Sequence, residues 1–463
     1  MIRASTYSSV STQRASVICR RHNLCGKCAW AYSLNSDLKI CMYNVWHTRM
    51  KIRVLAIVLA LSAGISGLSP QASAADQPDN QPITLLIGLD GLRWDIIDRH
   101  PAPTLQRLAD QGVRAQGLIP VLPSKTFPNF YAIATGLYPE NNGVMDNTTY
   151  APEINTTFRM SDQNDARWFQ GEPIWVTAEQ QGVRAATMFW VGSAAPVAGT
   201  RPSYWRQFDG SVSNAARVQQ VFDWLDLPEP ERPGFISLYF EAIDSASHGA
   251  GVDSAEERQA VADVDAELAH LLQGLESRGL LTQMNIVIVG DHGMTDLSAD
   301  RIIYLDDYVD FSSLHSPQLS GERQGNAVFA AFHGEDVSVE NVYQALALAH
   351  PKMQVYRKSQ FPDWFRLSHP DRGPDLLIVP DNGWLLSKRG IEFRGPRATH
   401  GFSPQHRDMH AALIASGPAF RQGVTVEPLH VVDIYGILSR TLGIVPADND
   451  GSARRIGTLF RPD

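Results

Sequence analysis

The chain has 463 residues, of which 44% are hydrophobic and 19% charged, a composition that excludes an intrinsically disordered protein. This length can hold two or three average domains or one large α/β enzyme domain. Residues 1–75 contain nine of the 40 Lys and Arg and one of the 49 Asp and Glu, which leaves 31 against 48, a net charge of −17, for the rest of the chain, and such an acidic surface disfavours binding to polymeric nucleic acid.

The N-terminal region has the pattern of an export signal that follows an extension. Met50–Arg53 is a short basic start, Val54–Leu61 is an apolar run and Ala72–Ala74 is a small-residue cleavage pattern, which together predict a secretory signal peptide over residues 50–75. Because such signals lie at the very N-terminus, we expect residues 1–49 to be a non-native upstream extension. The apolar run is too short to span a membrane, so we expect a soluble, secreted protein, most simply periplasmic.

All four cysteines lie in the expected extension, at Cys19, Cys25, Cys28 and Cys41. Cys25 and Cys28 form a C-x-x-C pair, which is typical of zinc or redox sites when a second pair accompanies it. Here the sequence contains no second pair. We therefore expect the exported part to contain neither thiols nor disulfides, as a protein with a large core can do.

Apolar, strand-like runs recur at Ile83–Leu89, Ala185–Trp190, Phe235–Phe240, Ile286–Val289, Leu376–Val379 and Ala411–Ala415. Between Val261 and Leu275 apolar residues recur at helical spacing in a charged segment, which predicts an amphipathic helix. Short apolar strands that alternate with helices predict an α/β fold, with a mostly parallel central sheet flanked by helices on both faces. No repeat or low-complexity linker interrupts residues 76–463, which we expect to form a single catalytic domain.

Three of these strands lead into residues that can bind metals. Asp90 directly follows the first strand, Asp244 and His248 follow the third, and Asp291 and His292 follow the fourth. Ligands of open parallel sheets bind at the carboxyl ends of the strands. We therefore expect these side chains to converge at one edge of the sheet.

Taken singly, most of these residues have ordinary structural explanations. Asp90 before a glycine is typical of a turn, and a lone histidine such as His248 or His400 is more often hydrogen-bonded or on the surface. The pair Asp291 and His292 is a stronger indication, because two adjacent polar groups after a buried strand cost stability unless something binds them. Together, three Asp and three His provide two ligand sets suited to zinc, and two zinc ions about 4 Å apart can hold the attacking and leaving oxygens of a phosphoryl transfer.

Eight stretches occur in the order Leu86–Gly91, Pro123–Asn129, Gly143–Asn147, Gly171–Trp175, Phe189–Ser193, Tyr239–His248, Gly290–Met294 and Thr399–Phe402. In this order the chain resembles the nucleotide pyrophosphatase/phosphodiesterases, in particular a secreted bacterial member. The resemblance extends over roughly residues 83–420. It implies an alkaline-phosphatase-like fold and a site that contains two zinc ions.

The resemblance also implies a role for each residue of the site. Thr126 matches the family's zinc-bound nucleophile, which forms a covalent nucleotidyl intermediate, and Asn147 matches the asparagine that donates a hydrogen bond to a phosphate oxygen. In the family one zinc is held by residues matching Asp90, Thr126, Asp291 and His292, and the other by residues matching Asp244, His248 and His400. A threonine hydroxyl needs such a cation, because it is otherwise a poor nucleophile at neutral pH.

Substrate recognition follows from the same resemblance. The family holds a nucleobase between two aromatic side chains, which Phe127 and Phe208 match, although tyrosine is usual at the second position; Tyr239 is a further substrate-binding candidate. Stacking tolerates this change because every base has a π-face. The alternative that both phenylalanines are core residues stays open. Neutral Asn147, without the arginine or third metal of the monoesterases, favours a diester.

Two departures from the family pattern remove no ligand. The usual Glu-Pro-Asp is Glu241-Ala-Ile-Asp244 here, and the usual glycine before the ligand histidine is Ser247. We predict a two-zinc hydrolase of small nucleotide phosphodiester and pyrophosphate bonds, for example of ATP to AMP and pyrophosphate. A choline-phosphodiesterase, phospholipase-C-like or phosphomonoesterase specificity at the same metal site, and a secreted protein that binds zinc or a nucleotide without catalysis, are the alternatives.

Overall fold

The computed structural model of the chain describes residues 83–462 except 311–325, 328–329, 334–335 and 394. The upstream extension and the signal peptide expected at the N-terminus lie outside the described residues. Within the described part of the chain, none of the helices is long and apolar enough to cross a membrane.

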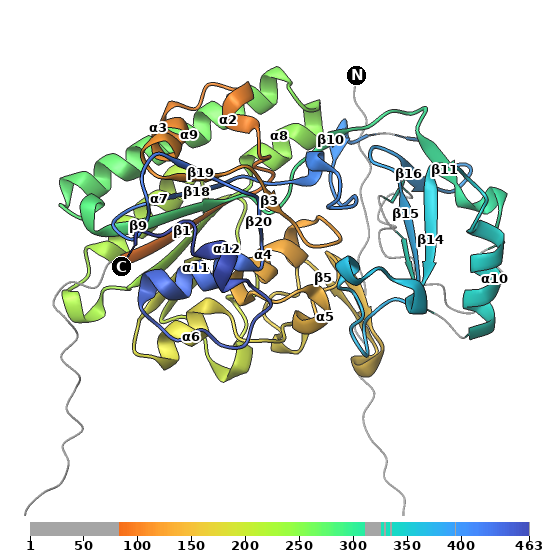
Figure 1. Cartoon of the computed structure of the whole chain (residues 1–463), viewed down its shortest axis with the longest axis horizontal. Helices are drawn as coiled ribbons and strands as arrows, with labels where there is room; N and C mark the ends of the chain where they lie inside the picture. Colours follow the sequence, from red (N-terminus) through yellow and green to blue (C-terminus); the bar gives the residue numbers. More distant parts are fainter. Residues whose placement is uncertain (1–82, 311–325, 328–329, 334–335, 394, 463) are drawn as a thin grey trace, which may run out of the picture. The chain divides into compact units, whose positions relative to one another are not determined.

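A mixed sheet of eight strands forms the centre of the fold, in the order β19-β2-β18-β9-β1-β8-β6-β7 (Figure 1). Its strands are β1 (Ile83–Leu89), β2 (Val113–Ala115), β6 (Ala185–Met188), β7 (Tyr204–Arg206), β8 (Phe235–Phe240), β9 (Met284–Val289), β18 (Leu413–Ser416) and β19 (Val424–Val426). Strands β9, β1, β8, β6 and β7 run parallel, whereas β18 is antiparallel to both β9 and β2. The predicted fold class is confirmed, with one reversed strand where the sequence predicts Ala411–Ala415.

Helices cover both faces of this sheet because its strands are apolar on both sides. In β1, Leu86 packs into one core, whereas Leu85 and Ile87 pack into a second core on the opposite face, as the alternation of side chains along a strand requires. The first core includes side chains of α4 (Thr126–Thr135), α6 (Ile174–Gln180) and α11 (Asp433–Leu442). The second includes those of α3 (Pro103–Gln111), α7 (Asn214–Leu225) and α9 (Ala255–Ser277), the last containing the predicted amphipathic helix.

A smaller group of strands lies between β9 and β18 in the sequence. The predicted strand at Leu376–Val379 is β15 (Leu376–Pro380), but it belongs to a separate antiparallel sheet with β13 (Ala330–Phe332) and β14 (Met353–Arg357). A second small sheet contains β11 (Ile302–Tyr304), β16 (Leu385–Ser387) and β12 (Asn326–Ala327), and α10 (Asp336–Leu346) accompanies these strands. These elements share a core of their own around Phe332 and Ile378.

Short elements connect the sheets and complete the fold. They are α2 (Ile96–Arg99), α5 (Pro139–Asn142), α8 (Ala242–Ala250), α12 (Ala453–Ile456), β3 (Leu118–Ile119), β4 (Thr148–Ala151), β5 (Thr156–Arg159), β10 (Thr295–Asp296), β17 (Ala398–Thr399) and β20 (Leu429–His430). Helix α8 and strand β10 follow the carboxyl ends of β8 and β9. They therefore begin at the edge of the sheet where the sequence predicts the metal ligands.

Candidate functional site

Neighbouring parallel strands bring the predicted ligands together at one edge of the sheet. Asp90 follows β1, which lies between β8 and β9, and Asp244 and Asp291 follow those two strands. Gly91 has a φ of +70°, and a Cβ there would lie 3.0 Å from the Cα of Asp244. Only glycine therefore fits this turn, and its N–H donates a 3.1 Å hydrogen bond to Asp291 Oδ1.

Two groups of ligand atoms form within this edge. Asp90, Asp291 and His292 make one group and Asp244, His292 and His400 the other, with the ligand atoms of each group within 4.8 Å of one another. His248 adjoins the second group, since its Nε2 lies 3.4 Å from Asp244 Oδ1. The structure thus gathers all six predicted ligand side chains, with His292 at the junction of the two groups.

Three carboxylate oxygens of the site are buried without a hydrogen-bond donor among the described residues, namely Asp90 Oδ1, Asp244 Oδ1 and Asp291 Oδ2. Burial, reinforced by the charges of Asp291 and Asp244, raises the pKa of Asp90 well above its ordinary value, and burial also raises the pKa of Asp244. Buried carboxylate oxygens that lack a donor are costly. Divalent cations would compensate all three, so this donor set fits a metal site.

The three histidines are oriented as metal ligands are. Each Nδ1 lies at hydrogen-bond distance from a backbone carbonyl oxygen, His248 from Ala398 (2.8 Å), His292 from Gly293 (2.9 Å) and His400 from Ser124 (2.9 Å). If each Nδ1–H donates to that carbonyl, Nε2 presents its lone pair towards the carboxylates. Burial, together with the neighbouring histidines, lowers the pKa of His400 well below its ordinary value, which favours the neutral form that binds metals.

Thr126 and Asn147 lie beside this cluster. Thr126 is the first residue of α4, and its hydroxyl oxygen is 3.4 Å from His292 Nε2. The N-terminus of the helix, where Thr126 lies, carries a partial positive charge. Asn147 Oδ1 accepts a 2.9 Å hydrogen bond from the Phe127 N–H. This leaves the NH2 group of Asn147 to donate, as the predicted contact with a phosphate oxygen requires.

An ion pair that no motif above indicates joins the segments of these two residues. Lys125 Nζ lies 2.8 and 2.9 Å from the carboxylate oxygens of Asp146, and Asp146 Oδ1 also accepts a 2.6 Å hydrogen bond from the N–H of Asn147. Lys125 precedes Thr126 and Asp146 precedes Asn147. Opposite charges beside two predicted catalytic residues are the one signal in the sequence that could have revealed this pair.

A cavity of about 480 Å³ opens onto Thr126 and the ligand cluster. Its lining also includes Phe189, Phe208 and Tyr239, whose rings contact one another and which we call its aromatic end. Phe189 is not among the site residues predicted from the sequence. Phe208 is 41% exposed, so the alternative that it is a core residue is wrong. Phe127 lines the cavity but is only 5% exposed, belongs to the first core and packs against Phe158, so the alternative that it is a core residue is confirmed for Phe127.

Tyr239 connects the two ends of the cavity. Its hydroxyl donates a 2.6 Å hydrogen bond to Asp90 Oδ2, and its ring makes an edge contact with Phe208 at a centroid distance of 6.1 Å. Burial and the charge of Asp90 raise the pKa of Tyr239 well above its ordinary value. The phenol therefore stays protonated and orients a predicted metal ligand, in addition to lining the cavity.

Known proteins resemble this chain over most of its described length. The family model of type I phosphodiesterase / nucleotide pyrophosphatase matches residues 84–403. Ectonucleotide pyrophosphatase/phosphodiesterase family member 3 of Bos taurus is 33% identical over 86% of this chain and 46% of its own length, and bis(5′-adenosyl)-triphosphatase of Xenopus laevis is 33% identical over 81% of this chain and 82% of its own. The chain spans about half the length of several of these curated relatives.

Solved structures share the fold. Human ectonucleotide pyrophosphatase/phosphodiesterase 5 superimposes with a TM-score of 0.76 at 29% sequence identity. The match covers 82% of this chain and 100% of the human chain. An inactive threonine-to-alanine variant of the murine protein, in complex with AMP, gives a TM-score of 0.75 at 28% identity with the same coverage. From its sequence match, its fold and its cluster of ligand residues, the chain belongs to the type I phosphodiesterase / nucleotide pyrophosphatase family.

Proposed function

We propose that the protein is an exported, zinc-dependent hydrolase that cleaves phosphodiester and pyrophosphate bonds of nucleotides, for example ATP to AMP and pyrophosphate. The observation that carries the proposal is the position of the Thr126 hydroxyl, 3.4 Å from His292 Nε2, between buried carboxylates without donors and a cavity with an aromatic end. A binding protein without catalysis would not need a hydroxyl at this point.

The residues divide the reaction between them. Two zinc ions held by Asp90, Thr126, Asp291 and His292 and by Asp244, His248 and His400 would supply Lewis acids for the oxygens that carry charge. Thr126 Oγ1 attacks the phosphorus next to the nucleoside and loses its proton to solvent. The bond from that phosphorus to the bridging oxygen breaks, so that pyrophosphate leaves in the case of ATP and the nucleotidyl group remains as an ester of Thr126. Asn147 donates a hydrogen bond to a non-bridging oxygen during this step. Water then attacks the same phosphorus, releases the nucleoside monophosphate and restores the hydroxyl.

Two features of the site support a nucleotide diester as the substrate. Lys125, the cation beside the nucleophile, is paired with Asp146 and Asn147 is neutral, which suits a phosphate with one negative charge rather than the two of a monoester. The aromatic end of the cavity suits a base, because aromatic side chains stack on any nucleobase. The murine relative whose structure contains AMP supports the same substrate class.

The test is the ratio of kcat/KM for bis-p-nitrophenyl phosphate to that for p-nitrophenyl phosphate, measured on the zinc-loaded protein. We expect a ratio well above one, loss of activity on chelation and recovery with zinc. A ratio below one would contradict the proposal and favour a phosphomonoesterase. ATP and glycerophosphocholine then separate the remaining alternatives, since a choline phosphodiesterase would turn over the second compound and hardly the first.

A further inference from the structure

Helix α8 carries two of the six ligands, Asp244 and His248, on one face. It has nine residues and is too short to be stable without tertiary contacts, so its neighbours determine where these ligands point. On the ligand side, β17 and the residue before it hold α8 in place. The N–H of Arg397 donates a 2.8 Å hydrogen bond to the carbonyl oxygen of His248, and His248 Nδ1 lies 2.8 Å from the carbonyl oxygen of Ala398 in β17.

An adjacent face of α8 is attached through Ser247, which is fully buried and directly precedes His248. The hydroxyl oxygen of Ser247 lies 2.9 Å from Glu257 Oε1 and 2.9 Å from the carbonyl oxygen of Ile243. A hydroxyl has one proton to donate, and a carboxylate is the stronger acceptor. Ser247 therefore ties α8 to Glu257, in the first turn of α9.

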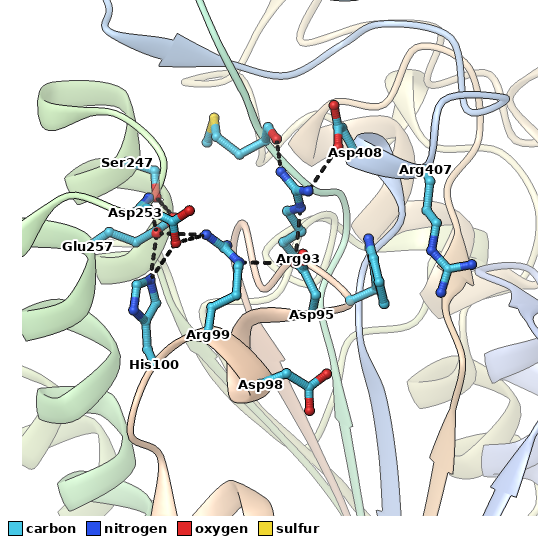
Figure 2. Close-up of polar contacts among 12 residues, drawn as sticks. Arg93, Asp95, Asp98, Arg99, His100, Ser247, Asp253, Glu257, Arg407 and Asp408 are labelled. Carbon is cyan, nitrogen blue, oxygen red and sulfur yellow. Dashed lines mark hydrogen bonds and ion pairs between the residues drawn. The ribbon is translucent and has the colours of Figure 1, made fainter.

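Glu257 is a rigid anchor because several donors hold it in a buried position. It is 1% exposed, and its Oε2 lies 2.7 Å from His100 Nε2 and accepts a 2.8 Å hydrogen bond from the N–H of Asp253. Arg99 Nη1 lies 3.5 Å from the same oxygen (Figure 2). A buried carboxylate with this many partners has little freedom to move.

The same network reaches the other ligand segment. Arg99 forms an ion pair with Asp95 at 3.3 Å, and Asp95 forms one with Arg93 at 3.0 Å. Arg93 Nη1 donates a 3.1 Å hydrogen bond to the carbonyl oxygen of Met294, two residues beyond His292. Figure 2 shows this continuous series of contacts from Glu257 to Arg93. It is linked to α8 through Ser247 and to the loop after β9 through Met294.

His100, Asp253 and Glu257 also have the composition of a cation site, since their ligand atoms lie within 4.8 Å of one another. The guanidinium of Arg99, however, already forms ion pairs with both carboxylates. The protein itself supplies the positive charge there. The cluster is therefore better explained as a support for α8 than as a further metal site.

We propose that Glu257 is a positioning residue of the zinc site, which acts through the Ser247 hydroxyl to fix α8 and with it Asp244 and His248. The inference rests on the proposed function, because it concerns the affinity of the same site for zinc. The resemblance described above places glycine at position 247, so the contact between hydroxyl and carboxylate distinguishes this chain from the usual pattern of its family.

The experiment compares Ser247→Ala and Glu257→Gln with the unchanged protein. We expect one of the two zinc ions to bind about 10- to 100-fold more weakly in each variant, the size of effect typical for groups that orient metal ligands, in a titration against a competing chelator. At subsaturating zinc, kcat for ATP should fall while KM stays the same, and excess zinc should restore kcat.

Asp265→Asn is the matched control for the loss of a buried carboxylate from α9. Asp265 accepts hydrogen bonds from the N–H groups of Thr104 and Leu105 in α3, far in sequence from α8, so this change should lower Tm and leave zinc affinity unchanged. If Ser247→Ala and Glu257→Gln behave like Asp265→Asn, Glu257 is a structural residue only and the inference is overturned. Should Glu257→Gln not fold, Ser247→Ala alone decides. An unchanged protein that binds no zinc would instead refute the proposed function.

Discussion

The two ends of the cavity at the candidate site are built in different ways. The end with the ligands rests on the carboxyl ends of β1, β8 and β9, and its carboxylates are held by buried contacts. Two of the three aromatic side chains at the other end come from loops: Phe208 lies between β7 and α7 with 41% of its surface exposed, and Phe189 follows β6 with a φ of +68°. We infer that the end with the ligands determines the chemistry, so substitutions at that end should affect kcat. The aromatic end determines which substrate is held, so substitutions at that end should affect KM.

Thr126→Ala should have the largest effect. It removes the proposed nucleophile, and we expect kcat for bis-p-nitrophenyl phosphate and for ATP to fall by at least about 10⁴-fold. Zinc content should stay near that of the unchanged protein, because six other ligands remain. Thr126→Ser, which keeps the hydroxyl, should retain measurable turnover. Activity in Thr126→Ala within tenfold of the unchanged protein would assign the nucleophile elsewhere.

Asp146→Asn tests the ion pair that aligns Thr126 with Asn147. We expect kcat to fall by about 10- to 100-fold, since small displacements of reacting groups have effects of this size, whereas KM for ATP changes little. Steady-state kinetics with both substrates measures the split. Asp381→Asn is the control, because Asp381 pairs with Lys352 at an exposed position, where an ion pair contributes little. An unchanged kcat in Asp146→Asn would show that helix α4 alone positions the nucleophile.

Tyr239→Phe tests the residue that touches both ends. Loss of the hydroxyl that donates to Asp90 Oδ2 should weaken zinc binding by about tenfold, and should leave base stacking intact because the ring stays. Competition with a chelator measures the affinity. Tyr204→Phe removes a similar hydroxyl, bonded to the carbonyl oxygen of Glu231 at an exposed position, and should have no effect. If KM for ATP changes instead of zinc affinity, Tyr239 belongs to the aromatic end only.

The end with the ligands could be predicted from the sequence because its residues follow the strands that the sequence predicts. Asp90 directly follows an apolar run, Asp291 and His292 follow another after one glycine, and parallel neighbours must end at the same edge. His400 follows β17, which pairs with β10 outside the central sheet, so only the family resemblance indicated it. The helix at Val261–Leu275 was likewise predictable from the spacing of its apolar residues alone. One face of α9 is buried, and this burial requires apolar residues at helical spacing.

Other features depend on pairings between distant segments, which local patterns do not encode. The apolar run at Leu376 suits a central strand as well as β15 of a separate sheet, because periodicity shows burial and not the partner. The contacts of Lys125 with Asp146 and of Ser247 with Glu257 join different elements. The backbone of Phe189 adopts a positive φ, unusual for a bulky residue, which the sequence does not show.

Phe208→Ala should have the smallest effect and separates the two ends most directly. Base stacking contributes about 1–3 kcal/mol per base. Because Phe208 is partly exposed, we expect its contribution at the lower limit of this range, so kcat/KM for ATP should fall roughly fivefold, through an increase in KM. Phe208→Tyr should restore it. Trp364→Ala changes an exposed aromatic residue in the connection between β14 and β15 and should have no effect. The value for bis-p-nitrophenyl phosphate should fall less, because its nitrophenyl ring offers a smaller stacking surface than adenine. An equal loss for both substrates would mean that Phe208 supports the chemistry, and the division between the two ends would then be wrong.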